Sequence, residues 1–360
     1  MSRHRVRGVV VGVLALGVAA FLLIRLPQLV GTTWGRVGAQ LWDLHPRTLA
    51  VLSLVWFVSM LAYTLVQVSA LPGLAHGRAL LMNFSSSAIA SGVPGGGALS
   101  LANNWYMLRA WGFSNAQFTT YTLMANLAIA AGKLCLPILG ALAGVLLGVR
   151  LPGWAGVVVA TCAAVLVLGA VGIRLAGAAS RRGAWLPSRP EEGRVRRWSV
   201  HVVAAVQEGL RECGQVIREG HLRLFGGVAA QFTAQYLLLL LCLRATGAAA
   251  TPGQVLFAYA IGRVVTVIPI TPAGLGASET GAGATLVAWG GAAAPTIAGN
   301  LLFTMFVVLL EIPVGAACLG VWHLVRRRGQ TALAADTEPD VEPGAERQTE
   351  PGVERQAGQE

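Results

Sequence analysis

The sequence has little charge and almost no lysine. Only 12% of its 360 residues are charged, whereas soluble domains carry roughly 25%. Lys133 is the only lysine, and 27 basic residues outnumber 16 acidic ones, which gives a formal net charge of +11. This composition supplies too little polar surface for a water-exposed globule, so it excludes an ordinary soluble domain.

Several functional motifs are also missing. The five cysteines are scattered, form no CxxC pair and have no histidine near them at metal-ligand spacing. The sequence contains no GxxxxGK[ST] phosphate-binding loop, and its arginines are not accompanied by a base-reading or stacking motif. We therefore expect no cofactor, no metal site, no ATP hydrolysis by the chain itself and no nucleic-acid partner.

Long apolar runs dominate what is present. Hydrophobic residues make up 55% of the chain, and a helix needs about 20 mostly apolar residues to span a hydrocarbon core of about 30 Å. The expected spans lie near residues 8–24, 49–71, 79–101, 114–131, 134–149, 154–173, 222–243, 252–270, 276–290 and 296–325. The pattern predicts an all-α, polytopic transmembrane helical bundle of 8–10 spans with two broken or re-entrant Gly/Pro segments, at Ser85–Gly97 and Pro269–Gly283. Ten crossings and eight crossings with re-entrant pieces both fit. The first run is expected to be an uncleaved helix rather than a signal peptide.

Arginine clusters set the expected orientation. Ten arginines accompany five acidic residues in 174–223, and Arg326–Arg328 follow the last run. The positive-inside rule places these segments and both termini in the cytoplasm. Within the loop 174–221, the stretch Trp198–Glu219 is amphipathic. It either lies on anionic lipids of the inner leaflet or packs as a linker helix on its own protein.

The last segment differs in composition from the rest. Residues 326–360 are rich in Pro, Gly, Glu and Gln and contain no aromatic residue, which is typical of disorder. We therefore expect a transmembrane domain over residues 1–325 and a disordered cytoplasmic tail over residues 326–360.

One segment occurs twice. Pro94–Gly112 aligns without gaps with Pro272–Gly290 at a shift of 178 residues, and seven of the nineteen positions are identical. Both copies end in Ala-Trp-Gly. The alignment indicates an internal duplication, and paired interrupted helices are typical of transporters.

The two copies begin with Gly- and Pro-rich breaks in apolar sequence. Such breaks free backbone polar groups at membrane depth, which is tolerated only where protein or a watery cavity satisfies them. A helix that starts after a break directs N–H groups and a positive dipole end at the site, which suits a phosphate. The residues expected to line this site are Pro94, Gly95, Gly96, Thr271, Pro272, Gly274 and Gly276.

Basic residues near these breaks are candidate partners of a phosphate. Lys133 lies between two apolar runs; it is either in a short loop and extends to the interface, or it lies deep and balances a lipid phosphate or a carboxylate. Arg109, with Asn103 and Asn104 nearby, either binds a headgroup phosphate or marks a helix end at the interface.

Two carboxylates fall in apolar regions. Glu279 follows the second break and Glu311 lies in the last long run. Intramembrane carboxylates are costly and are functional by default. Each either carries a proton during transport, pairs with Arg263 in the preceding run, or forms an inert buried ion pair that fixes helix register.

The motifs resemble those of a known family. Arg263, IPITPAGLGASE at Ile268–Glu279 and SGVPGGG at Ser91–Gly97 are similar to the flippase-like membrane region of lysylphosphatidylglycerol synthases and their stand-alone relatives. The resemblance covers roughly residues 8–325, and Ala273 stands where many relatives have glycine. It implies a bacterial or archaeal inner-membrane protein that moves a lipid or assists its movement. Two-domain members add a soluble aminoacyltransferase domain, which we do not expect here.

Three functions remain open. The first is a translocase that moves a phospholipid, an aminoacyl-phospholipid or a polyprenyl-phosphate-linked lipid across a bacterial inner membrane without ATP, with Glu279→Gln expected to abolish transport. The second is a non-catalytic membrane partner that stabilises a lipid- or envelope-modifying enzyme. The third is a membrane enzyme acting on a lipid-linked substrate, although the acidic or His-bearing loops typical of such enzymes are not visible. We favour the translocase and expect no enzymatic activity.

Overall fold

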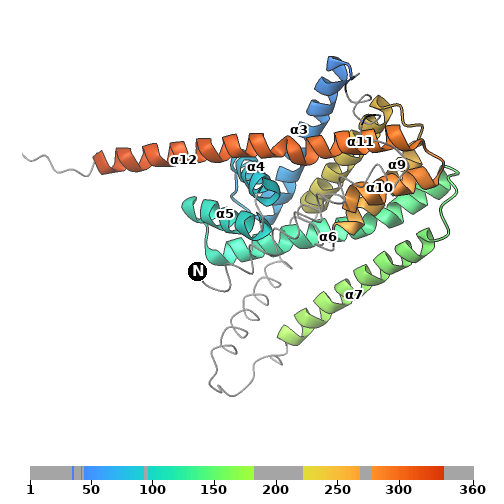
Figure 1. Cartoon of the computed structure of the whole chain (residues 1–360). Coiled ribbons are helices and arrows are strands. Elements are labelled where there is room, and N and C mark those ends of the chain that lie inside the picture. The colour runs from blue at the N-terminus through green and yellow to red at the C-terminus, as the bar shows by residue number, and fades with distance from the viewer. Residues whose placement is uncertain are drawn as a thin grey trace, which may run out of the picture. The chain divides into compact units, whose positions relative to one another are not determined.

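Helices form nearly all of the described structure. It is a computed structural model that describes Gly35, Trp42 and residues 44–92, 96–181, 222–267 and 277–335. Within these ranges no regular element is a strand. Five helices there are long and apolar enough to cross a membrane: Pro46–Ala70, Asn115–Leu146, Ala155–Gly172, Leu222–Ala245 and Ala293–Leu324. The all-α, multi-span class is therefore confirmed (Figure 1).

The first half of the chain contains one long helix, a helical hairpin and a second long helix. These are α3 (Pro46–Ala70), α4 (His76–Gly92), α5 (Gly96–Ala110) and α6 (Asn115–Leu146). α4 and α5 pack against each other and have only 17 and 15 residues, fewer than the roughly 20 that a span needs. Of the two expectations for residues 79–101, a crossing and a re-entrant piece, the structure agrees with the re-entrant piece, because the chain turns back after α4.

The second half repeats this plan. It contains the helix Leu222–Ala245, α9 (Pro252–Val265), α10 (Ala277–Ala288), α11 (Ala293–Thr304), the π-helical turn η2 (Met305–Leu309) and α12 (Glu311–Ala335). α9 and α10 pack together and have 14 and 12 residues. The predicted spans 252–270 and 276–290 are thus the two arms of a second hairpin. α7 (Ala155–Arg181) connects the halves.

The helix boundaries carry the same 178-residue offset as the sequence repeat. α5 ends at Ala110 and α10 at Ala288, while α6 begins at Asn115 and α11 at Ala293. The glycine that follows each hairpin, Gly112 or Gly290, has a positive φ of 90° or 84°, a conformation that glycine adopts without strain. The duplication therefore extends beyond the aligned segment to the arrangement of hairpin and following helix.

α6 is one continuous helix of 32 residues, about 48 Å long at 1.5 Å per residue. Lys133 and Pro137 both lie inside it. The prediction of separate spans over 114–131 and 134–149 is therefore wrong, and of the two alternatives for Lys133 the loop is ruled out. Packing against α9 stabilises the continuous helix. A Cβ at Gly140 would lie 3.2 Å from the Phe257 Cα, so the two backbones approach closely there.

The ends of two helices differ from the expected boundaries. α7 continues to Arg181, into the predicted loop 174–221, and α12 continues to Ala335, beyond the predicted start of the tail at residue 326. The chain divides into two compact units, Met1–Leu319 and Gly320–Glu360, and everything described below lies in the first. The predicted span 8–24, the amphipathic stretch 198–219 and residues 336–360 lie outside the described residues.

Candidate functional site

The side chain of Lys133 links the middle of α6 to the second hairpin. Its Nζ donates a hydrogen bond to Thr266 Oγ1 at 2.9 Å. Thr266 is the C-cap of α9, and its hydroxyl donates in turn to the Arg263 carbonyl oxygen at 2.7 Å. Lys133 is half-buried, so the structure supports the deep location over the loop location. A hydroxyl group, which carries no charge, is the partner of this ammonium group.

Arg263 lies one helical turn before Thr266. Its guanidinium carbon stacks over the rings of Tyr259 and Phe303, 5.0 Å and 5.3 Å from their centroids. Such cation–π contacts leave the edge of the guanidinium able to donate hydrogen bonds. Because Lys133 donates a hydrogen bond to Thr266, one helical turn after Arg263 on α9, this part of the bundle carries two neighbouring positive charges. An anion such as a phosphate is the ligand that this arrangement favours.

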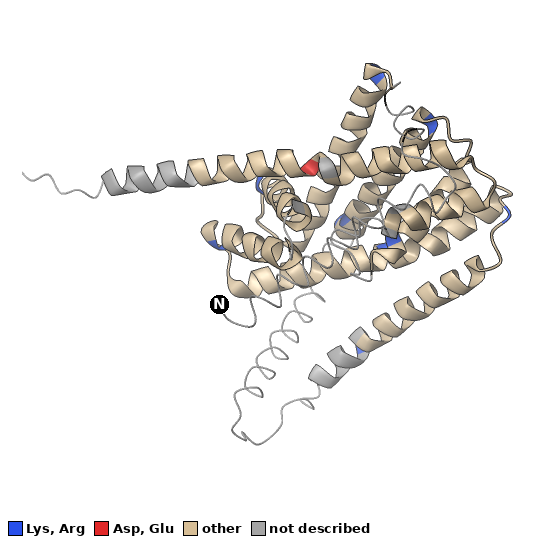
Figure 2. Cartoon of the chain, viewed as in Figure 1, with Lys and Arg blue, Asp and Glu red and all other residues tan. Residues whose placement is uncertain are grey.

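Glu311 is negatively charged and lies beside the first hairpin. It is the only acid among the residues whose side chains are described, it is 6% exposed, and Figure 2 shows how sparse charge is along these helices. Its carboxylate lies next to the Ser87 hydroxyl on α4 and the Trp56 indole on α3, within the electrostatic reach of Arg263. The predicted Arg263–Glu311 interaction is therefore a longer-range electrostatic one rather than a direct ion pair.

Lys133 and Glu311 occupy equivalent positions in the two halves, 178 residues apart. Each contacts the hairpin of the other half: Lys133 contacts the second and Glu311 the first. Each also lies beside a helix irregularity. Pro137 lacks the N–H that the Lys133 carbonyl would normally accept, and Glu311 directly follows η2, the kind of π-helical turn often found at functional sites.

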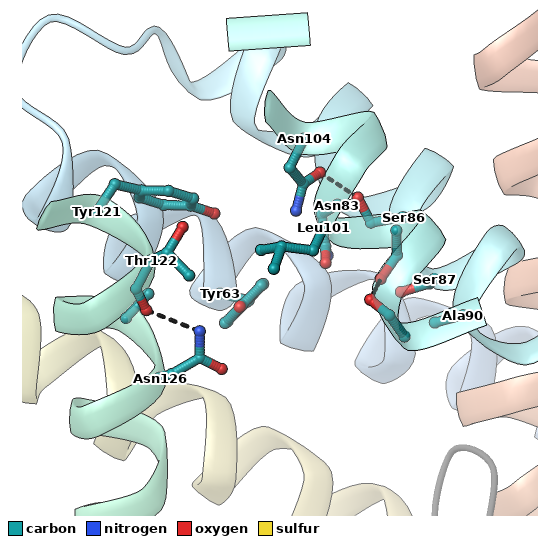
Figure 3. Close-up of a pocket in the computed structure, with 13 residues that line it drawn as sticks. Tyr63, Asn83, Ser86, Ser87, Ala90, Leu101, Asn104, Tyr121, Thr122 and Asn126 are labelled. Carbon is teal, nitrogen blue, oxygen red and sulfur yellow. Dashed lines mark hydrogen bonds between the residues drawn. The ribbon is translucent and has the colours of Figure 1, made fainter. Parts of the chain in front are cut away.

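A polar cavity of about 380 Å³ lies between α3, α4, α5 and α6. None of the described residues that line it is charged. Figure 3 shows amide and hydroxyl groups from α4 and α5 facing those from α6 across this space. Its polar lining residues are Tyr63, Asn83, Ser86, Ser87, Ser100, Asn104, Tyr121, Thr122 and Asn126.

Several cavity groups hold one another in place. The Ser86 hydroxyl donates to Asn104 Oδ1, Asn126 Nδ2 donates to the Thr122 carbonyl at 2.7 Å, and Gln67 donates to the Tyr121 hydroxyl at 3.1 Å. Asn126 and Lys133 are seven residues apart on α6, which places them on one face about 10 Å apart along the helix. The cavity and the cationic pair therefore share one wall.

A second, nearly closed cavity corresponds to the first by the repeat. Four of its lining residues lie 178 residues after lining residues of the polar cavity: Ser278 after Ser100, Ala282 after Asn104, Asn300 after Thr122, and Phe303 after Ala125. Arg263 and Tyr259 also line it, and only about 10 Å³ remains open. The two halves thus contain equivalent cavities that differ in the charge of their lining residues and in their open volume.

The comparison with known families agrees with this arrangement. The family described as the lysylphosphatidylglycerol synthase TM region matches residues 9–315, which include both hairpins and both charged positions. The chain belongs to this family. A search of curated proteins found no significant match. The site therefore lies within the lysylphosphatidylglycerol synthase membrane region, and the chain is a multi-pass membrane protein.

The predicted site residues of this family member divide into three groups. Asn104 lines the cavity, and Lys133, Arg263 and Glu311 lie at the two charged positions. A Cβ on Gly96 would overlap the carbonyl oxygens of Ile89 and Ala90, so this glycine permits the close packing of the first hairpin.

Two predicted residues point elsewhere. Asn103 Nδ2 lies 3.4 Å from Met107 Sδ on its own helix and is not a cavity residue. Arg109 is exposed and donates to the Phe113 carbonyl at 3.0 Å, which fits its interpretation as the end of α5. Pro94, Gly95, Thr271, Pro272, Gly274 and Gly276 lie outside the described residues, as does the side chain of Glu279.

Sequence reasoning missed most of the cavity. Asn83, Ser86, Tyr121, Thr122 and Asn126 are small or neutral polar residues inside apolar runs, and such residues commonly serve helix packing in membranes. The available signal was their spacing, because Thr122 and Asn126 share one face of α6 with Lys133.

Proposed function

We propose that the chain is a lipid translocase that passes the phosphate-bearing headgroup of a lipid through a site at the middle of α6, without hydrolysing ATP. The observation that carries this proposal is the placement of Lys133 and Glu311 at equivalent positions of a duplicated fold. Lys133, on α6, faces the second hairpin, and Glu311, on α12, faces the first. Transporters built from such repeats bind their substrates near the bilayer midplane at the repeat interface.

The order of elements supports inverted halves. Each half crosses the membrane, enters and leaves as a hairpin, and crosses back, so it begins and ends on one face. α7 then carries the chain to the other face before the second half begins. The segment 182–221 is too rich in arginine and glutamate to cross. The two hairpins therefore enter from opposite faces, as alternating access requires.

The charges supply a mechanism for movement. A lipid phosphate that binds Lys133 and Arg263 replaces Thr266 as the partner of the ammonium group and bridges α6 to α9 in place of the direct hydrogen bond. Only the second hairpin changes its link to α6 in this step. The lipid then shifts the equilibrium between the two open states by its differential affinity for them.

The arginine clusters orient this device. The loop 174–221 and Arg326–Arg328 lie in the cytoplasm of a bacterial inner membrane under the positive-inside rule, with both termini on that side. The first hairpin then enters from the cytoplasm and the second from the outer face. Arg78 near the start of α4 and Arg109 near the end of α5 fit the cytoplasmic assignment.

Leaflet exchange tests the proposal. Purified protein is placed in vesicles that contain phosphatidylglycerol with a fluorescent acyl chain, and a reductant that cannot cross the membrane bleaches the outer leaflet. We expect the whole fluorescence to become accessible without ATP, whereas protein-free vesicles retain a protected half. Equal protected fractions in the two preparations would contradict the proposal for phospholipids. Arg150→Met removes one positive charge from the exposed loop between α6 and α7. It is the control for removing the charge of Lys133 with Lys133→Met, and it should exchange lipid like the wild type.

A further inference from the structure

The polar cavity differs from the cationic pair in its chemistry. Hydroxyl and amide groups line it, and none of its lining residues in the described part of the chain is Lys, Arg, His, Asp or Glu. Hydroxyl and amide groups both donate and accept hydrogen bonds, as do the hydroxyls of a polyol. A cationic headgroup in a water-poor cavity would instead need a carboxylate on the wall, because an unpaired buried charge is very costly.

The hydrogen-bond directions leave groups that suit a ligand with hydroxyls. Asn104 uses its Oδ1 to accept from Ser86, so its amide hydrogens remain for other acceptors. The Tyr121 oxygen accepts from Gln67, so its own proton also needs an acceptor. Thr122 Oγ1 is buried and has no hydrogen-bond partner among the described residues, although buried hydroxyls are normally paired.

Glu311 is the one carboxylate near this cavity among the residues whose side chains the structure describes, and it does not line the cavity. It is buried behind Ser87, beside Trp56, and is not a lining residue. A cationic headgroup in the cavity would face the Ser87 hydroxyl rather than the carboxylate. The cavity wall that a ligand meets is therefore neutral.

We infer that the cavity binds an uncharged, hydroxyl-rich headgroup that is attached to the lipid phosphate held by Lys133 and Arg263. The volume of about 380 Å³ falls in the range of small-molecule sites, roughly 300–1,000 Å³. The cavity begins about 10 Å along the same face of α6 from Lys133, and helical side chains lean toward the helix N-terminus, which is the direction of the cavity. The inference rests on the proposed function and names its substrate class.

The repeat provides the variants that test this assignment. In the second cavity, Phe303 stands where the first has Ala125, and Ala282 stands where the first has Asn104. Ala125→Phe should therefore fill the polar cavity with a ring, and Asn104→Ala should remove its amide donors. Leu127→Phe, at an exposed position of α6 outside the lining, is the matched control for adding an aromatic ring.

The experiment compares labelled lipids that share a phosphate and differ in what it carries. These are phosphatidic acid, phosphatidylglycerol, phosphatidylinositol, phosphatidylethanolamine and lysylphosphatidylglycerol. We expect the two polyol lipids to exchange roughly tenfold faster than phosphatidic acid and the two cationic-headgroup lipids, the ratio that about 1.4 kcal/mol of added hydrogen bonding gives. Asn104→Ala and Ala125→Phe should remove this preference, so that the polyol lipids exchange no faster than phosphatidic acid does in the same variant, and Leu127→Phe should keep the preference.

The outcomes separate the two claims. Exchange of all phospholipids at one rate, or fastest exchange of the cationic-headgroup lipids, would overturn the headgroup assignment while leaving translocation intact. Absence of exchange for every lipid would instead overturn the proposed function. Should Ala125→Phe fail to fold, Asn104→Ala carries the test, because it removes atoms without adding bulk.

Discussion

Glu311 is a buried carboxylate whose close neighbours are a hydroxyl and an indole rather than a basic side chain. Buried charges are normally paired, because desolvation of an ion is costly. In this protein the nearest described cation that acts on it is Arg263, which is itself engaged with two aromatic rings. The electrostatic interaction between Glu311 and Arg263 can therefore strengthen or weaken when the hairpins move.

We predict different stabilities for two Glu311 variants. Glu311→Gln keeps the size of the side chain and an oxygen beside the Ser87 hydroxyl, so the free energy of unfolding should change by less than about 1 kcal/mol. Glu311→Leu removes the polar group beside that hydroxyl and should lower it by about 1–3 kcal/mol. Thermal unfolding of the purified protein in detergent measures both. Equal unfolding temperatures for the two variants would show that Glu311 makes no stabilising hydrogen bonds.

At the scale of elements, α6 is the wall that both hairpins share. Thr266 at the end of α9 joins it through Lys133, and α4 and α5 join it through the polar cavity. The hydroxyl of Thr266 is the one group that both accepts from the ammonium group and donates to the α9 backbone. It therefore fixes the end of α9 against α6.

Conservative changes at Thr266 should separate its shape from its hydroxyl. Thr266→Val keeps the branched shape but removes the acceptor for Lys133, and we expect the free energy of unfolding to fall by about 1–2 kcal/mol. Thr266→Ser keeps the hydroxyl and should stay within about 0.5 kcal/mol of the wild type. The same melting experiment in detergent applies. If the serine variant lost as much stability as the valine variant, the contact would depend on the methyl group instead.

The sequence allowed the elements to be predicted more reliably than their lengths. Hydropathy indicated every long described helix, and the repeat alignment located both hairpins. We predicted an interruption around Lys133, because a charge is costly inside an apolar helix, yet α6 continues through this position and packs against α9. The cavity depends on four helices meeting, and the neutral residues Ser86 and Asn126 give no local sign of this.

At the scale of the whole chain, an even count of crossings in each half and the single crossing of α7 predict inverted halves. The ends at which the two hairpins join their flanking long helices should therefore lie on opposite faces of the membrane. The positive-inside rule predicts that the arginine-rich segment 174–221 lies on the cytoplasmic face. In the proposed translocase, this orientation would let one site open alternately to either side.

Cysteine labelling tests that topology. In a variant without native cysteines, single cysteines at the exposed positions Ala75 and Ala116 flank the first hairpin, and those at Ala249 and Ala292 flank the second. An impermeant maleimide added to intact cells should label the second pair and spare the first, and permeabilised cells should label all four. Labelling of Ala75 and Ala116 on opposite faces would instead restore a single crossing in place of the first hairpin.

The most direct test of the account is the rate of phosphatidylglycerol exchange by wild type and Lys133→Met, reconstituted at equal protein density. Methionine keeps an unbranched chain of similar length without the charge, so we expect it to fold and to exchange lipid at least about tenfold more slowly, which corresponds to about 1.4 kcal/mol of lost phosphate binding. Lys133→Arg should retain most of the wild-type rate. A folded Lys133→Met protein that exchanges phosphatidylglycerol at the wild-type rate would contradict the claim that lipid phosphates pass this position.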